Sequence, residues 1–209
     1  MSLFRFARFP ESPQRLQAEG LYLRPALIGD FAAWRELREE SRSFLAPWEP
    51  TWPYDDLTKS SFRRRVLRQE RDRVADEAYG FLIFRERDNA LLGGATLGNV
   101  RRGVAQTATL GYWMGAPHAG QGHMSRAVRL LARHAFDHLR LHRIEAACAP
   151  QNERSRRLLE HVGFRHEGYA RAYLLIDGEW QDHLLFGLLE DELAPLGAAR
   201  QTGQSGQFR

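Results

Sequence analysis

The chain has 209 residues, 43% of them hydrophobic, which is enough to bury the core of one ordinary domain. Its formal net charge is +4, and Lys59 is the only lysine, so almost all of the positive charge is arginine, which suits an anionic ligand. No apolar stretch approaches the roughly 20 residues that span a bilayer, and no secretory signal precedes the first predicted element. Because Cys148 is the only cysteine, an intrachain disulfide is excluded. The composition therefore predicts a cytoplasmic protein without a membrane partner.

The first half of the chain predicts a short strand and two helices around an irregular segment. Residues 1–20 are interpreted as an N-terminal extension, and residues 21–24 as the first strand of a domain that runs to residue 190. A helix with Asp30 as its N-cap is expected to end near residue 41. Three prolines interrupt residues 44–54, which therefore form a packed loop or a substrate-binding lip. A basic helix follows at residues 57–74.

The second half alternates strands and helices. Strands are predicted at residues 79–85, 91–99, 105–114, 143–149, 171–176 and 183–189, and helices at residues 124–139 and 152–161. Residues 191–209 are rich in Gly, Gln and Ala and are predicted to be a disordered tail. This order describes a mixed α/β (α+β) domain rather than a doubly wound one.

A glycine-rich turn, Gly120-Gln121-Gly122-His123-Met124-Ser125, precedes the helix expected at residues 124–139. Such a turn gathers free backbone N–H groups at the positive end of a helix dipole, which suits a pyrophosphate. The signal is weak by itself, because the same residues can simply turn the chain. A dinucleotide fold is disfavoured, since Ser125 stands where the third glycine of that pattern belongs. A Walker loop is excluded, because the chain has no Gly-Lys-Ser/Thr.

Several motifs occur in an order and spacing that resemble one family. They are Leu110-Gly111-Tyr112-Trp113-Met114, the turn at 120–124, Leu141-His142-Arg143-Ile144-Glu145-Ala146, Asn152-x-x-Ser155, Val162-Gly163-Phe164, Glu167-Gly168-Tyr169 and the run from Tyr173 to His183. Together they resemble the GNAT superfamily of N-acetyltransferases, and within it the RimJ/RimL branch, which acetylates ribosomal proteins. The final run is similar to the ribosomal-protein-alanine acetyltransferases. The resemblance covers residues 21–190 and implies a central, mostly antiparallel sheet of about six to seven strands flanked by about four helices.

The resemblance also implies a site for acetyl-CoA as co-substrate, with no metal. The pantetheine would bind the strand end at Trp113 and Met114, and the pyrophosphate would bind the amides of Gly120, Gln121, Gly122, His123, Met124 and Ser125. Met124 would narrow the room beside the phosphates. Asn152 would hydrogen-bond the pantetheine, cap its own helix, or do both. Ser155 would donate a proton to the leaving thiolate, since Leu159 replaces the tyrosine of many relatives; alternatively, Ser155 bonds a preceding carbonyl.

The implied reaction is direct transfer, in a ternary complex, to the N-terminal α-amine of a protein, here a ribosomal protein with N-terminal alanine. The glutamate base of RimL-like relatives is not carried over, because its position holds Leu174; Glu145 and His142 are weak substitutes. Glu49, Asp55 and Asp56 are alternatives that would attract a cationic terminus. The acceptor-binding candidates are Trp48, Glu49, Tyr54 and Tyr173.

Other interpretations remain open from the sequence. The acceptor could be a small-molecule amine such as an antibiotic, a polyamine or an amino sugar, or the chain could be a ribosome-associated assembly factor. The basic helix at residues 62–73 would then dock ribosomal RNA, although a solvated helix is the simpler interpretation. His134 and His138 have metal-ligand spacing without a partner motif, so a zinc site is disfavoured. Both a monomer and a homodimer are compatible with the sequence.

Overall fold

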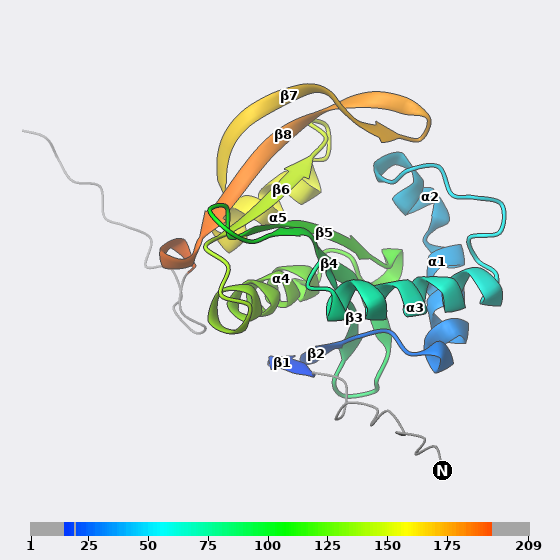
Figure 1. Ribbon diagram of the computed structural model, residues 1–209. Coiled ribbons are helices and arrows are strands. Elements are labelled where there is room, and N and C mark those ends of the chain that lie inside the picture. The colour runs from blue at the N-terminus through cyan, green and yellow to red at the C-terminus, as the bar shows by residue number, and fades with distance from the viewer. Residues whose placement is uncertain (1–14, 19, 194–209) are drawn as a thin grey trace, which may run out of the picture.

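The computed structural model describes residues 15–18 and 20–193 and shows one sheet with helices on both faces (Figure 1). The strands are β1 (Leu16–Ala18), β2 (Leu21–Arg24), β3 (Tyr79–Arg85), β4 (Leu91–Arg101), β5 (Thr107–Met114), β6 (Arg143–Cys148), β7 (Arg165–Ile176) and β8 (Glu179–Leu189). The α-helices are α1 (Phe31–Glu40), α2 (Arg42–Leu45), α3 (Lys59–Val74), α4 (His123–Arg133) and α5 (Glu153–Val162). Helix α4 continues into a π-helical turn at His134–His138.

The eight strands are ordered β1-β2-β3-β4-β5-β6-β8-β7, and every neighbouring pair is antiparallel except β5 and β6. The parallel pairing begins at Thr107 opposite Arg143 and ends at Leu110 opposite Ala146. Strand β5 continues to Met114 along β4 and β6 continues to Cys148 along β8, so the two strands separate beyond that point. The sheet therefore splays open in its middle, with backbone groups of β5 left unpaired on the β6 side.

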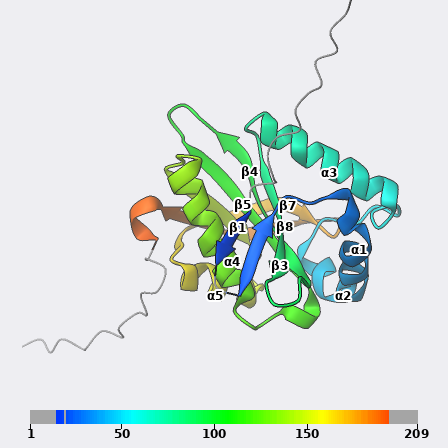
Figure 2. The same cartoon turned by 90° about the horizontal axis from the view of Figure 1, so that it is seen from below.

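Helices α4 and α5 cover one face of the sheet and α1 and α3 cover the other (Figure 2). The larger core cluster lies under α4 and α5 and includes Leu131 and Phe186, and a smaller cluster around Trp34 and Phe62 lies under α1 and α3. Because successive side chains of a strand point to opposite faces, Tyr112 packs against the first cluster and its neighbour Trp113 against the second.

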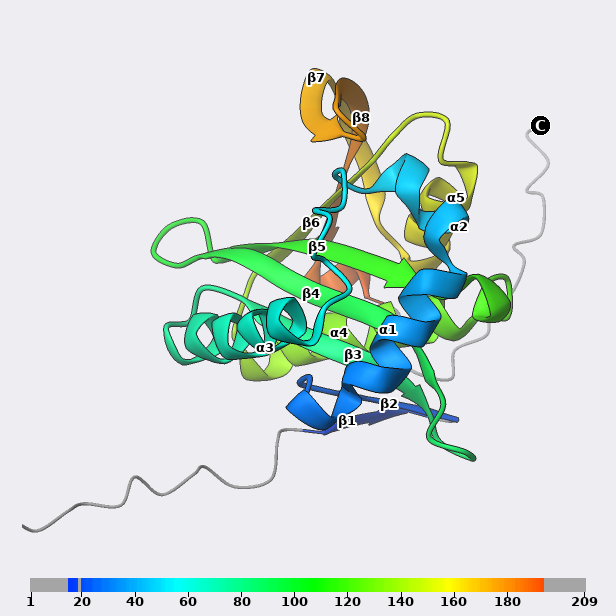
Figure 3. The ribbon, with the colours of Figure 1, turned by 90° about the vertical axis from the view of Figure 1, so that its right-hand side faces the viewer.

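The hairpin of β7 and β8 extends beyond the body of the sheet (Figure 3). Much of its surface is apolar and exposed, and the large exposed side chains include Tyr169, Tyr173 and Trp180. At its tip, the Asp177 N–H donates a hydrogen bond of 3.2 Å to the carbonyl oxygen of Glu49. This bond connects the hairpin to the proline-rich segment after α2, residues 46–56.

The mixed α/β fold and nearly all predicted elements are confirmed, with three differences. Residues 16–18 form β1 within the predicted extension, which brings the strand count to eight. Strands β7 and β8 start at Arg165 and Glu179, earlier than the expected residues 171 and 183. Asp30 does not cap α1 with its side chain: its carboxylate accepts hydrogen bonds from Arg24, at 2.7 and 2.6 Å, and from the backbone N–H of Leu27.

The predicted tail from residue 194 and most of the predicted extension lie outside the described residues. Among residues 15–193, position 19 aside, no helix combines the length and the apolar character that crossing a bilayer requires.

Candidate active site

The turn between β5 and α4 offers a set of backbone donors. Within the described chain, the N–H groups from Gly120 to Ser125 donate no hydrogen bond to a protein acceptor. Gly120 and Gly122 have φ angles of 75° and 74°, which glycine adopts without strain. Apart from the adjacent residues in the chain, no described residue lies within 4 Å of the position that a Cβ atom would take at either glycine. These open amides stand at the positive end of the α4 dipole, so the turn is suited to a diphosphate.

The Arg126 side chain adds to the positive potential of the turn. The Arg126 guanidinium donates to Nδ1 of His123 at 2.9 Å, which leaves the other ring nitrogen free to carry a proton. Burial and then the charges of Arg126 and Arg85 lower the pKa of His123, so its ring is neutral at pH 7. The expectation that Met124 narrows the site is wrong, because its side chain is buried in the core at 6% exposure.

The second part of the site is the start of α5. The Asn152 Oδ1 accepts the Ser155 N–H at 3.0 Å, so the predicted helix cap is confirmed. Only the oxygen of the Asn152 side-chain amide takes part in the cap, and the nitrogen of that amide has no hydrogen-bond partner in the described chain. The same side chain can therefore cap α5 and donate to a ligand.

Ser155 points to the splay rather than along its own helix. Its hydroxyl is 2.7 Å from the hydroxyl of Tyr112, which stands on β5 just past the last residue paired with β6. The alternative bond from Ser155 to a preceding carbonyl is not present. Cys148, at the end of β6, is buried. Burial raises the pKa of its thiol, and the neighbouring Ser155 hydroxyl offsets this in part.

Tyr112 is a residue that the sequence reasoning did not place in the site. We expected no tyrosine there, because Leu159 occupies the helix position used by many relatives, and Leu159 is fully buried. The available signal was the strand alternation, which puts Tyr112 on the same face as Leu110, toward the helix that carries Ser155.

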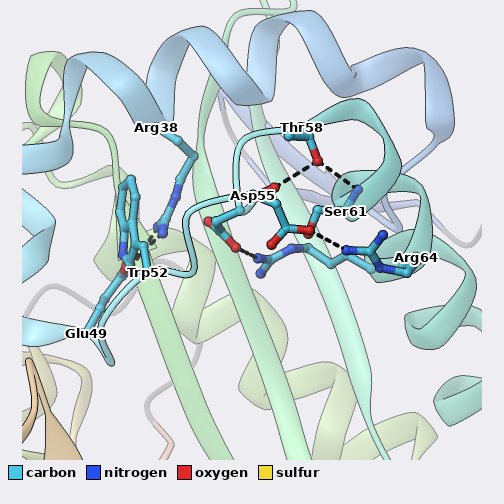
Figure 4. A network of polar contacts seen from close by, with 9 residues as sticks. Arg38, Glu49, Trp52, Asp55, Thr58, Ser61 and Arg64 are labelled. Carbon is cyan, nitrogen blue, oxygen red and sulfur yellow. Dashed lines mark hydrogen bonds and ion pairs between the residues drawn. The ribbon is translucent and has the colours of Figure 1, made fainter.

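The proline-rich segment after α2 is held by arginines (Figure 4). Arg38 donates two hydrogen bonds to the Glu49 carboxylate, at 2.8 and 2.7 Å, and the Trp52 indole donates a third at 2.7 Å. Asp55 and Asp56 each form one ion pair with an arginine of α3: Asp55 with Arg64 at 2.7 Å and Asp56 with Arg65 at 2.8 Å. A cationic terminus drawn to these carboxylates would have to compete with guanidinium groups that are already bound.

The remaining acceptor candidates do not form one cluster. Trp48 is 37% exposed beside Glu49, and Tyr173 lies on the hairpin that contacts this segment. Tyr54 is fully exposed and lines a separate depression of about 420 Å³ with Phe31 and Leu57. The structure therefore groups Trp48 and Glu49 with the hairpin and leaves Tyr54 apart from them.

The two weak substitutes for a base differ in their distance from the splay. His142 precedes β6 and lies roughly 20 Å along the chain from Cys148 at the splayed end, whereas Glu145 is the third residue of β6 and stands one residue before Ala146, the last residue paired with β5. Glu145 is also paired with Arg101 and Arg143, at 2.9 and 3.3 Å. The fold brings His183 of β8 to the splayed end: it is 4% exposed and immediately precedes Leu184, the residue opposite Cys148.

Two other features of the sequence have structural outcomes. The ring centroids of His134 and His138 are 5.2 Å apart, and the part of the chain that is described contains no group of three metal-ligating side chains.

On α3, Arg63, Arg68 and Arg71 form no ion pair with a described residue, whereas the other arginines of that helix do.

A splayed sheet, open amides at a helix start and a hydroxyl facing the splay define an acyltransferase site built for a nucleotide thioester. The chain belongs to the acetyltransferase (GNAT) domain family, whose model matches residues 20–165. It is 36% identical to the [ribosomal protein uS5]-alanine N-acetyltransferase of Escherichia coli, over 87% of this chain and 93% of that protein.

Solved structures agree with this assignment. The RimJ of Mycobacterium smegmatis in complex with CoA-disulfide superposes with a TM-score of 0.80 at 34% identity, covering 90% of this chain and 91% of that one. The ribosomal-protein-S5-alanine acetyltransferase of Vibrio fischeri gives the same TM-score of 0.80 at 29% identity, covering 87% of this chain and 100% of the other. The chain is thus an acetyltransferase, with relatives whose structures contain coenzyme A.

Proposed function

We propose that this enzyme transfers the acetyl group of acetyl-CoA to the N-terminal α-amine of a ribosomal protein that begins with alanine. The observation that carries the proposal is the row of open amides at Gly120–Ser125 beside the splay, which fits a diphosphate and orients a thioester toward Ser155. The acceptor class is supported by the similarity to the uS5-alanine N-acetyltransferase along almost its whole length.

In this proposal, each part of the site has one task. The amides of Gly120–Ser125 hold the pyrophosphate, and the pantetheine is held by the Asn152 amide nitrogen and by the end of β5 at Trp113 and Met114, on the side where β5 no longer pairs with β6. The β5 amides in the splay stabilise the oxyanion that forms when the amine attacks the thioester carbonyl. Ser155 gives its proton to the departing sulfur.

An α-amine suits a site in which the carboxylates near the acceptor segment are already paired with arginines. The pKa of a free α-amine is near 8, so about a tenth of it is neutral at pH 7, whereas under about 0.1% of a lysine side chain is neutral. The attacking amine therefore needs little help from a protein base. Exposed Trp48 and Tyr173, on either side of the Glu49–Asp177 contact, are the groups we propose to receive the acceptor peptide.

The test uses purified enzyme, labelled acetyl-CoA and three peptides of one internal sequence. The first begins with a free alanine, the second is N-acetylated and contains a lysine, and the third begins with a free proline. We expect α-acetylation of the first peptide only, located by fragment-ion mass spectrometry. Acetylation of the lysine peptide, or transfer to spermidine or an aminoglycoside at a higher kcat/KM, would replace the proposed acceptor.

A further inference from the structure

Ser155 is held at two points, and the second has no role in folding α5. Its backbone N–H is fixed by the Asn152 cap, and its hydroxyl lies 2.7 Å from the Tyr112 hydroxyl. Tyr112 belongs to β5 and Ser155 to the helix after β6, so this hydrogen bond crosses the sheet where the two strands have separated. It is a specific contact between the two walls of the splay.

The direction of this hydrogen bond follows from what surrounds each hydroxyl. The Tyr112 hydroxyl has no other acceptor in the described chain, and the ring packs against the core, so an unpaired O–H there would carry a desolvation cost. Burial raises the pKa of Tyr112, so the phenol is protonated at pH 7 and can donate. The arrangement that satisfies this partly buried donor is Tyr112 O–H donating to Ser155 Oγ.

We propose that Tyr112 is a positioning residue for acetyl transfer: by donating to Ser155 Oγ, it turns the Ser155 proton toward the departing sulfur. A serine hydroxyl has one proton, and with one lone pair occupied by Tyr112 that proton points either to the neighbouring Cys148 sulfur or into the splay. Without Tyr112, the Ser155 hydroxyl rotates among its staggered positions and is aimed correctly for only part of the time. This inference rests on the proposed role of Ser155.

The proton inventory of the step is balanced. The C–N bond forms as the amine attacks, and the carbonyl electron pair moves to oxygen. When that pair returns, the C–S bond breaks, and its electrons stay on sulfur, which takes the proton from Ser155 Oγ. Ser155 is reprotonated through water by the proton that the acceptor nitrogen loses. Tyr112 keeps its own proton throughout and is not consumed.

The test is a double-mutant cycle on Tyr112→Phe and Ser155→Ala, with Tyr22→Phe as the matched control. Tyr22 is likewise a strand tyrosine, buried where Tyr112 is partly buried, and its hydroxyl donates to Asn89 at 2.9 Å, outside the site. We expect Tyr112→Phe to lower kcat about tenfold, the value of one hydrogen bond, and to leave both KM values within about twofold. Ser155→Ala should lower kcat about 100-fold, and adding Tyr112→Phe to it should change nothing further.

The contrary results are distinct. Unchanged kcat in Tyr112→Phe, a loss in Tyr22→Phe of the same size, or independent losses that multiply in the double variant would each overturn the positioning role. Thermal denaturation of all variants shows whether a loss reflects unfolding instead, which would also count against it. The cycle is measured on the acceptor that the wild-type enzyme acetylates fastest. A wrong acceptor class and a wrong role for Tyr112 therefore give different results.

Discussion

Replacing His134 with leucine should make the fold less sensitive to acid. His134 begins the π-helical turn after α4 and is 2% exposed, and neither of its ring nitrogens has a hydrogen-bond partner among the described residues. The rings of Tyr79 and Phe81 pack edge-on against it. Burial, followed by the nearby His138, lowers the pKa of His134 from 6.5 to about 4. The folded protein therefore holds this ring neutral under conditions where the unfolded chain would protonate it.

The sign and the size of the effect follow from that difference in pKa. Because the folded pKa lies below the unfolded one, the unfolded chain binds the extra proton between pH 6.5 and about 4, and stability falls as the pH falls through this window. The contribution is close to zero at pH 7.5. At pH 4.5 the linkage relation gives a loss of about 2.5 kcal/mol from this one residue.

The assay is urea unfolding of the wild-type protein and His134→Leu at pH 7.5 and pH 4.5. Leucine has a similar volume and no polar atoms to satisfy, so the variant should be at least as stable at pH 7.5. Its advantage over the wild type should grow by about 2.5 kcal/mol at pH 4.5. His161→Gln, which removes an exposed histidine, serves as the control. Parallel losses in the wild type and His134→Leu would show that this ring is not the acid-sensitive group.

Three further outcomes are expected. Asn152→Asp keeps the helix cap but loses the amide donor, so the acetyl-CoA KM should rise about tenfold without a loss of thermal stability, whereas Asn152→Ala should also cost about 1 kcal/mol in denaturation. Gly122→Ala should weaken coenzyme A binding in calorimetry by more than tenfold, whereas Gly103→Ala, with a similar φ of 65° far from the site, should cost similar stability and leave binding unchanged. Arg38→Met should destabilise the protein by about 3–5 kcal/mol in urea, with partial recovery when Glu49→Gln is added, because the variant removes the only cation paired with the partly buried Glu49 carboxylate among the described residues and leaves it the Trp52 indole alone as a side-chain donor.

The sequence predicted most of the fold because hydrophobic periodicity is a local property. It could not place residues 16–18 in the sheet, since a three-residue strand has too short a pattern and its pairing with β2 depends on the tertiary structure. Asp30 shows the same limit: the cap preference is local, but the carboxylate is captured by Arg24, six residues earlier in the chain.

In the site, the motifs supplied the backbone turn and the Asn152 cap, whose geometry is set within a few residues. The partner of Ser155 was missed because Tyr112 lies 43 positions away and meets it only through the splay. His142 and Glu145 were considered because they are near the motifs in sequence, but His142 stands before the start of β6, away from its splayed end, and the Glu145 carboxylate is already paired with Arg101 and Arg143. Distance along a strand cannot be judged before the active end of the sheet is known.

The parallel pairing of β5 and β6 explains why the parts of the site meet at all. Parallel strands end at the same edge of a sheet, so the helices that follow them, α4 and α5, both begin at that edge. One helix start presents open amides at Gly120–Ser125, and the other carries Asn152 and Ser155 in its first turn. In the proposed function, both dipoles therefore direct positive potential to where negative charge would be bound or develop: the diphosphate at α4 and the departing sulfur at α5. An antiparallel neighbour in place of β6 would send its following helix to the far edge and separate the proton donor from the thioester.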